Sequence, residues 1–123
     1  MITTIHSYGG VTATVYVMNK SEKIPRHQHS FTHTTSVAAG ITQVVLWHEK
    51  EQPPRLEWFE MVPGDKPREL PANIDHEIIA YVDGTVVVNL SVGGPQTVAN
   101  ATHGEPAQAG GVALHDGMVV DAG

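Results

Sequence analysis

Short runs of strand-forming residues separated by turn-forming residues fill the first 92 positions and leave no segment with a sustained helical period. Five runs are rich in valine, isoleucine, threonine and aromatic residues: 11–18, 41–49, 56–61, 76–82 and 85–91. Such residues favour strands. The strongest hairpin signal is Asp83-Gly84, because both central residues of the tightest hairpin turns need a positive φ. Many short strands at close spacing predict an all-β antiparallel sandwich or barrel.

The composition changes at residue 93 of the 123-residue chain. Residues 93–123 hold seven of the twelve glycines and contain no lysine, arginine or aromatic residue. The length suits one domain. We therefore predict a β-barrel over 1–92, followed over 93–123 by a Gly/Ala-rich extension that is loosely ordered. The alternative for the extension is one added hairpin over 112–120, centred on Asp116-Gly117.

Charge and cysteine content narrow the classes of partner. Thirteen acidic residues against seven basic ones give a net charge of −6, and no basic run occurs, so we expect neither a nucleic acid nor an anionic membrane as partner. The absence of cysteine removes disulfides and thiolate metal sites. The start of the chain shows no secretory signal, and no apolar stretch approaches the length that spans a bilayer. We expect a cytoplasmic protein.

Three of the eight histidines, His27, His29 and His33, lie within seven residues. Residues separated by an even number share one face of a strand, so in an extended segment the three imidazoles would emerge on the same side. Pro25 and the β-branched residues nearby favour a strand over a helix. Three neutral imidazoles on one face suit Zn, Cu, Fe, Ni or Mn. His76, at the start of another predicted strand, is the candidate fourth ligand.

The spacing of these histidines resembles the two motifs of the cupin superfamily, small β-barrels with a metal inside. The first motif matches His27-x-His29, three residues, His33, six residues and Gly40. Cupins carry a glutamate where His33 stands and a glycine where Ser21 stands. The sequence is therefore similar to the compact four-histidine cupins that bind manganese or related divalent metals.

The second cupin motif matches Gly64, six residues, Pro71-x-Asn73, two residues and His76. The gap after Gly64 is one residue longer than in the motif, and Ala80 replaces the final asparagine. Asn73 replaces a glycine, a mild change because asparagine also tolerates a left-handed backbone.

The resemblance, which covers about residues 11–92, implies a single cupin-type antiparallel β-barrel (a double-stranded β-helix, or jelly roll). It also implies one divalent metal ion, Mn, Fe, Ni or Zn, bound by His27, His29, His33 and His76. Four imidazoles cancel none of the ion's charge, which strengthens its action as a Lewis acid. This suits a metal-dependent enzyme, oxygenase-like or else a lyase or isomerase, acting on a small oxygenated or anionic organic molecule. The alternatives are a non-catalytic module that binds a small ligand or a metal, and a structural barrel with incidental histidines.

No general base can be assigned from the sequence. Asp75 and Glu77 flank His76 and would point away from its face, so we interpret them as solvated charges. His48 is expected to be held by ordinary hydrogen bonds. We expect three aromatic residues to pack: Trp47, Trp58 and Phe59.

Two predicted strands are apolar on both faces, "TQVVLW" at 42–47 and "TVVVNL" at 85–90. Both faces of the sheet should then be covered. Since a single small domain offers little to cover the second face, we predict a homodimer.

Overall fold

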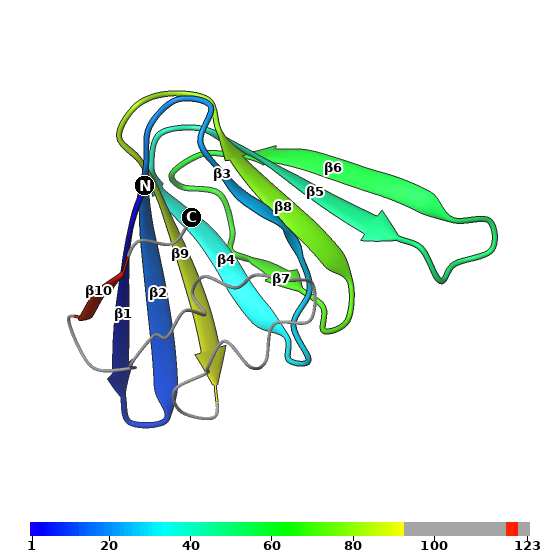
Figure 1. Ribbon diagram of the computed structural model, residues 1–123, viewed down its shortest axis with the longest axis horizontal. Helices are drawn as coiled ribbons and strands as arrows, with labels where there is room; N and C mark the ends of the chain where they lie inside the picture. The colour runs from blue at the N-terminus through cyan, green and yellow to red at the C-terminus, as the bar shows by residue number, and fades with distance from the viewer. Residues whose placement is uncertain (93–117, 121–123) are drawn as a thin grey trace.

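In the computed structural model, residues 1–92 and 118–120 are described, and they form two antiparallel sheets that face each other (Figure 1). The first sheet has six strands in the order β10-β1-β2-β9-β4-β7, and the second has four in the order β3-β8-β5-β6. In chain order the strands are β1 (Ile2–Tyr8), β2 (Val11–Met18), β3 (Lys23–His27), β4 (His33–Ala39), β5 (Thr42–His48), β6 (Arg55–Met61), β7 (Arg68–Leu70), β8 (Asp75–Ala80), β9 (Thr85–Val92) and β10 (Met118–Val120). The described residues contain no helix, hence none long and apolar enough to cross a membrane.

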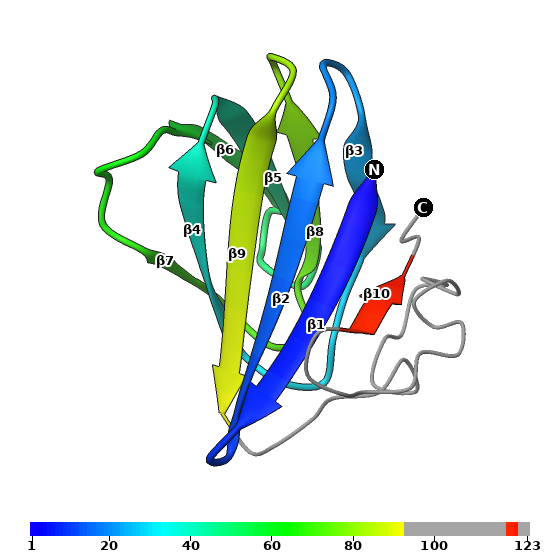
Figure 2. The same ribbon diagram turned by 90° about the vertical axis from the view of Figure 1, so that its left-hand side faces the viewer.

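The strand pairs are nested: β2 with β9, β3 with β8, β4 with β7 and β5 with β6. This nesting makes a jelly roll, in which the chain passes repeatedly between two sheets, as Figure 2 shows from the side. The predicted all-β jelly roll is confirmed. The five predicted runs become β2, β5, β6, β8 and β9, while β1 and β7 were not predicted as separate strands.

The core lies between the two sheets. The core forms because strand residues alternate between the two faces of a sheet. In β5, alternate residues from Thr42 to His48 are buried in the core, and the others are half-buried on the outer face. Its Val44 and Leu46 contact a set of buried side chains from both sheets, which includes Met18, Ile24, Val37, Met61, Leu70, Ile78 and Val87. Fully burying one side chain of this size contributes about 1.5–3 kcal/mol.

One aromatic residue predicted to pack does not. Trp58 is 59% exposed, because it lies on the outer face of β6, the edge strand of the four-stranded sheet. Trp47 is half-buried beneath the guanidinium of Arg26, 4.2 Å from the ring centre. Phe59 is half-buried with the guanidinium of Arg68 over its ring at 3.7 Å.

The positions where the cupin motifs carry glycine share a left-handed backbone. Their φ angles are 72° at Ser21, 83° at Gly40, 93° at Gly64 and 62° at Asn73. The expectation that Asn73 tolerates this conformation is confirmed. Gly40 has a second constraint, because a Cβ there would lie 2.6 Å from Cα of Thr85.

Strand β10 pairs antiparallel with β1 and forms one edge of the six-stranded sheet. The rest of the predicted extension, 93–117 and 121–123, lies outside the described residues. The domain boundary at residue 93, the loose order of the extension and the hairpin at Asp116-Gly117 therefore stay predictions.

Candidate metal centre

The segment that carries His27, His29 and His33 is not one strand, so the prediction of a single extended segment is wrong. β3 ends at His27 in the four-stranded sheet, and β4 begins at His33 in the six-stranded sheet. His29 lies in the segment that joins them, as an isolated bridge just before a bend at Ser30 and Phe31. The histidines come together because the chain crosses here from one sheet to the other, and not because a single strand alternates.

A β-bulge turns His27 inward. In the pairing of β3 with β8, Ile24 stands opposite Ile78 and His27 opposite His76, so three steps along β3 match two along β8. Both Ile24 and His27 are buried, although an odd separation would place them on opposite faces of a regular strand. A bulge inserts one residue and reverses the alternation beyond it. Pro25 is tolerated here because β3 is an edge strand, where its missing N–H breaks no ladder bond.

The turn before β8 holds the segment that carries His29. The backbone N–H of Asn73 donates to the carbonyl oxygen of His29 at 2.7 Å. The N–H of Ala72 donates to Oγ1 of Thr32 at 3.1 Å. The ring of His29 stacks on Phe31, with 4.7 Å between ring centres. The turn that leads to His76 therefore also fixes His29.

The rings of all four predicted histidines are in contact. Ring centres lie 4.4 Å apart for His27 and His76, 4.5 Å for His27 and His29, and 5.1 Å for His33 and His76. Ring nitrogens of His27, His29 and His76 all lie within 4.8 Å of one another. His33 adjoins this group from the opposite sheet, 5.4 Å from His29 between ring centres. Their role as metal ligands stays a prediction.

Hydrogen bonds to the backbone orient two of these rings. Nδ1 of His27 lies 2.6 Å from the carbonyl oxygen of Pro25, and Nδ1 of His76 lies 3.1 Å from that of Ile74. A carbonyl only accepts, so each Nδ1 carries the hydrogen and each Nε2 keeps its lone pair. Nε2 of His27 lies 2.8 Å from Nε2 of His29. Metal-binding histidines are held in the same way by a partner on the second ring nitrogen.

Two of the imidazoles have a buried nitrogen without a hydrogen-bond partner. Among the described residues, three buried side-chain polar atoms lack a hydrogen-bond partner: Oγ1 of Thr3, Nε2 of His33 and Nε2 of His76. Leaving such a group unsatisfied costs about 1–3 kcal/mol. A divalent ion would satisfy both nitrogens, so this donor set fits a metal.

Burial keeps three of these imidazoles neutral. Removal from water lowers the pKa of His29 from 6.5 to about 2 and that of His33 to about 3, and neighbouring histidines add to both effects. The same burial lowers the pKa of His76 well below 6.5. The neutral imidazole is the form that coordinates a metal, so these three are ready to bind without first losing protons.

The two acidic residues that flank His76 are less exposed to solvent than predicted. Asp75 is buried, with its carboxylate 2.7 Å from both Nε of Arg26 and Nε2 of Gln28, so its interpretation as a solvated charge is wrong. Glu77 is half-buried and lies 3.8 Å from Nζ of Lys23. Sequence reasoning missed the contacts of Asp75 because they depend on the register between β3 and β8.

His48 is held as expected. It is buried, and its Nε2 lies 2.9 Å from Oε1 of Glu57. It is the last residue of β5, two residues beyond Leu46, which pairs with His76, and it is not part of the histidine cluster.

An uncharged polar wall continues from His33 along the inner face of the six-stranded sheet. The buried hydroxyl of Thr35 donates to Oδ1 of Asn89 at 2.6 Å. Thr12 and Ser91, opposite each other in register on β2 and β9, are also buried. Hydroxyl and amide groups of this kind can exchange hydrogen bonds with an oxygenated molecule.

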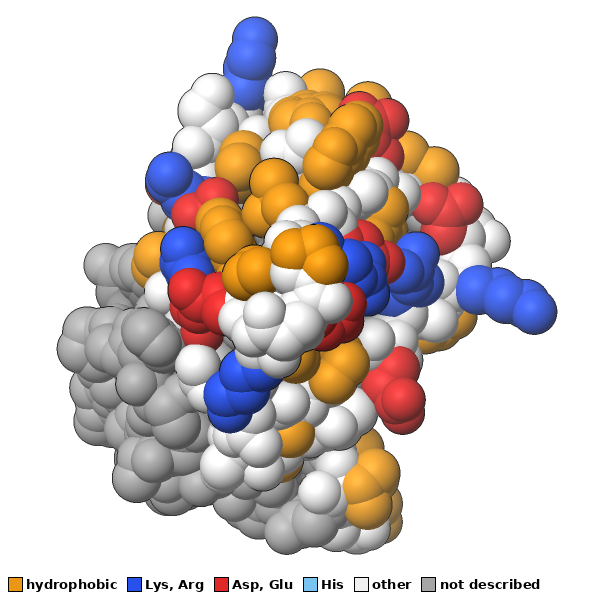
Figure 3. Space-filling view, turned by 90° about the vertical axis from the view of Figure 1, so that its right-hand side faces the viewer, with side chains coloured by type: hydrophobic (Ala, Val, Ile, Leu, Met, Phe, Trp, Pro, Cys, Tyr) orange, Lys and Arg blue, Asp and Glu red, His pale blue; other side chains and the backbone are white. Residues whose placement is uncertain are grey.

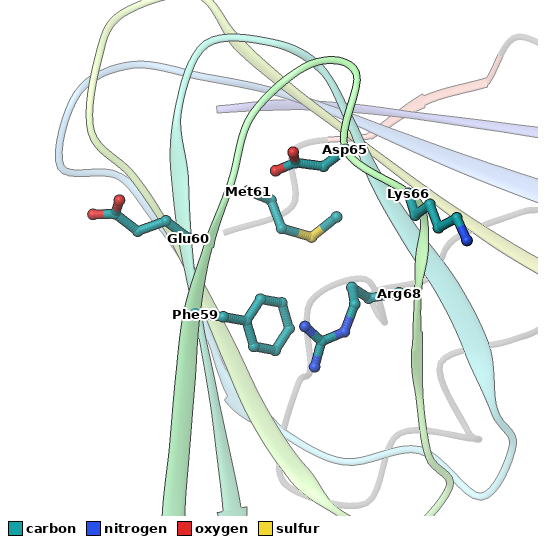
Figure 4. Close-up of a pocket in the computed structure, with 6 residues that line it drawn as sticks. All are labelled: Phe59, Glu60, Met61, Asp65, Lys66 and Arg68. Atoms are coloured by element: carbon teal, nitrogen blue, oxygen red, sulfur yellow. The ribbon is translucent and has the colours of Figure 1, made fainter.

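A separate hollow of about 230 Å³ opens beside β6 and the segment that leads to β7 (Figure 4). At its wall, the guanidinium of Arg68 lies next to the ring of Phe59. It is lined by Phe59, Glu60, Met61, Asp65, Lys66 and Arg68. None of the four clustered histidines lines it.

Two facing antiparallel sheets with nested strand pairs are the fold of a small cupin, so the fold that the resemblance implied is confirmed. The particular structures that this chain resembles include oxalate decarboxylase from Bacillus subtilis at pH 4.6, with a TM-score of 0.68, 16% identity, and coverage of 84% of this chain and 26% of that one. KdgF from a Halomonas species gives a TM-score of 0.60 and 20% identity over 77% of this chain and 79% of that one.

Other similar structures include the formate complex of Lactobacillus farciminis oxalate decarboxylase, with a TM-score of 0.65, 16% identity, and coverage of 87% of this chain and 30% of that one. A further structure of the Bacillus subtilis enzyme, studied for its Mn(II) centres, has a TM-score of 0.64 and 14% identity, and the match covers 75% of this chain and 23% of that one. The chain spans about a quarter of the length of the Bacillus subtilis oxalate decarboxylase chains that it matches. No protein-family model and no curated protein matches the sequence.

Proposed function

We propose that His27, His29, His33 and His76 hold one divalent metal ion, and that the loaded protein is a metal-dependent enzyme acting on a small oxygenated or anionic organic molecule. The observation that carries the proposal is the pair of buried, unpartnered Nε2 atoms of His33 and His76, which come from different sheets. Imidazole donors suit Mn, Fe, Ni and Zn. We place manganese first because the similar Bacillus subtilis oxalate decarboxylase has Mn(II) centres.

The charge balance of the site supports this class of substrate. A divalent ion held by four neutral imidazoles would keep its full charge and so would anchor and polarise an anionic or carbonyl oxygen. Beside His33, Thr35 and Asn89 offer hydrogen bonds to the rest of an oxygenated molecule. We place oxygenase-like chemistry first and lyase or isomerase chemistry second.

Asp75 is not the general base of the proposed reaction. Strand alternation places its side chain on the opposite face of β8 from that of His76. Both of its carboxylate oxygens accept hydrogen bonds, from Arg26 and from Gln28. Its role must therefore lie outside proton transfer to a substrate at the histidine face.

A non-catalytic module that binds a small ligand or a metal is the second candidate. It is favoured by the uncharged wall beside the histidines, because threonine, serine and asparagine bind oxygenated molecules but are weak acids and bases. Turnover distinguishes the two candidates. Manganese-loaded protein that binds small carboxylates or carbonyl compounds, yet neither consumes O₂ nor alters them, would favour the module.

Metal binding itself is tested on protein purified without an affinity tag. We expect one equivalent of Mn²⁺ in a calorimetric titration of chelator-treated protein, and loss of that binding in His76→Ala and His33→Ala. His48→Ala is the matched control, since it removes a buried histidine outside the cluster and should leave the stoichiometry unchanged. Unchanged metal content in His76→Ala, measured by elemental analysis, would refute the proposal.

We also propose a homodimer, as the sequence predicted, with β6 at its interface. β6 is an edge strand, paired with β5 on one side only, and has two exposed apolar side chains, Leu56 at 57% and Trp58 at 59%. Figure 3 views the molecule from this side, where hydrophobic side chains gather among charged ones. Exposed apolar edge strands favour pairing with another chain. The cytoplasmic location stays a prediction from the sequence.

A further inference from the structure

Asp75 is a carboxylate that lies on the outer face of its sheet and is nevertheless only 2% exposed. Its Oδ2 accepts a hydrogen bond from Nε of Arg26 at 2.7 Å, and its Oδ1 accepts one from Nε2 of Gln28, also at 2.7 Å. Both donors come from the end of β3 and the residue that follows it. One buried side chain at the start of β8 thus binds two side chains of the neighbouring strand segment.

The two donors are the residues on either side of His27, and Asp75 directly precedes His76. His27 and His76 are opposite each other in register. Because side chains alternate between the faces of a strand, Asp75 makes its contacts on one face of the sheet while the two imidazoles meet on the other. The carboxylate and its two donors therefore form a clamp behind the histidine pair.

On the outer face, side chains of β5 and of the segment after it contact the clamp. Trp47 stands opposite Asp75 in register on β5, and the guanidinium of Arg26 lies over the Trp47 ring at 4.2 Å. Arg26 also reaches Oε2 of Glu49 at 3.1 Å. Hydrogen bonds between charged groups are strengthened when water is excluded from them. Water is excluded from the Asp75 carboxylate, while the Arg26 side chain, which is 38% exposed, is oriented by its contacts with Trp47 and Glu49.

The backbone alone fixes this part of the sheet weakly. The ladder between β3 and β8 shifts register between Ile24 and His27, and β3 ends at His27. A bulge disrupts the local ladder and leaves a residue unpaired. The side-chain clamp lies at the place where regular backbone pairing is missing.

We propose that Asp75 is a positioning residue of the metal centre, which sets the distance between His27 and His76 through Arg26 and Gln28. This inference rests on the proposed metal-binding function. Partners behind metal ligands typically change metal affinity about 10- to 100-fold when they are replaced. We expect a loss of that size in Asp75→Asn, which keeps the shape of the side chain and removes its charge.

Glu77→Gln is the matched control. Glu77 also adjoins His76 and faces β3 from the same side of β8, but its contact is with Lys23 at 3.8 Å and not with the neighbours of His27. The experiment is a calorimetric titration of each chelator-treated, folded protein with Mn²⁺ at low temperature, together with the electron paramagnetic resonance spectrum of the bound Mn²⁺. We expect the affinity of Glu77→Gln to stay within about twofold and its spectrum to match that of the unmodified protein.

The spectrum separates positioning from a merely structural role. A carboxylate that only stabilises the fold would lower the melting temperature and leave the spectrum and affinity of the folded protein unchanged. Gln28→Ala provides a second variant if Asp75→Asn does not fold. It removes one donor, so we expect a smaller loss of affinity, of several-fold, and a broadened spectrum.

Unaltered affinity and spectrum in Asp75→Asn, or in Gln28→Ala if Asp75→Asn does not fold, would overturn the clamp and leave the metal site standing. Failure of the unmodified protein to bind Mn²⁺, Fe²⁺, Ni²⁺ or Zn²⁺ would overturn the proposed function and the clamp together.

Discussion

His27 and His76 stand opposite each other across β3 and β8, with their ring centres 4.4 Å apart, although 49 positions separate them in the chain. Direct cross-strand neighbours are the closest side-chain pairs that a sheet provides. Apolar side chains would stabilise this buried position better than two imidazoles, one of which has an unpartnered Nε2. The pair therefore costs the folded protein stability, which the proposed metal ion would restore.

His76→Leu should reverse the order of stability with and without metal. In the presence of a chelator, removing the unpartnered nitrogen should raise the free energy of unfolding by about 1 kcal/mol, a gain reduced by loss of the hydrogen bond from Nδ1 to the carbonyl oxygen of Ile74. With Mn²⁺ at 100 times its dissociation constant, the free energy of unfolding of the unmodified protein should rise by about 2.7 kcal/mol, and that of the variant should not change. Urea denaturation under both conditions measures this. Equal gains in the two proteins would contradict the prediction.

The metal-free protein should lose stability as the pH falls below about 6.5. Since burial lowers the pKa of His29 to about 2 and that of His33 to about 3, between 6.5 and those values the unfolded chain binds protons that the folded protein does not. Each such histidine lowers the free energy of unfolding by about 1.4 kcal/mol per pH unit. Denaturation at pH 7, 6, 5 and 4 with a chelator tests this. In His33→Leu the slope should be shallower by about 1.4 kcal/mol per pH unit, and identical slopes would refute the assignment.

Ser21→Gly should stabilise the protein by about 0.5–1 kcal/mol. Ser21 has a φ of 72°, a conformation that costs residues other than glycine about 1–2 kcal/mol, while glycine itself loses more entropy on folding. Ser36→Gly, within strand β4, is the control and should destabilise the protein by about 0.5–1 kcal/mol. Thermal and urea denaturation measure both. A loss of stability in Ser21→Gly would count against the strain at this turn.

Gly40→Ala should be far more harmful than Gly84→Ala. Both glycines have a positive φ, 83° and 75°, which alone should cost alanine about 1–2 kcal/mol. Only at Gly40 would the new Cβ collide with the backbone of Thr85, since nothing lies within 4 Å at Gly84. We expect this collision to lower the free energy of unfolding of Gly40→Ala by about 2 kcal/mol more. Similar free energies of unfolding for the two variants would contradict the prediction and show that the backbone at Gly40 moves to relieve the clash.

Trp58→Glu should convert the proposed dimer into a monomer. The substitution places a charge on the exposed face of edge strand β6, which natural proteins use to prevent edge pairing. Light scattering of the unmodified protein should give the mass of two chains, and that of the variant the mass of one. Lys66→Glu, in the loop after β6, is a charge-changing control that should leave the dimer intact. A monomeric mass for the unmodified protein would end the dimer proposal.

Much of the fold could be predicted because its signals are local. Turn residues and β-branched runs located β2, β5, β6, β8 and β9, and the spacing of the four histidines indicated that they converge. The mechanism of convergence could not be predicted. Strand alternation from His27 to His33 correctly predicted that the three imidazoles face one point. The assumed single strand was wrong, since the chain bends at Ser30 and Phe31 and changes sheet.

By itself, the sequence determined the class of fold and the identity of the clustered imidazoles, because strand propensity and motif spacing are properties of neighbouring residues. Only the tertiary structure decided that His27 turns inward through a bulge and that Asp75 is buried behind it. Both depend on the register between β3 and β8, strands about 50 positions apart in the chain. A shift of one residue in that register exchanges the two faces of a strand, and no local pattern records it.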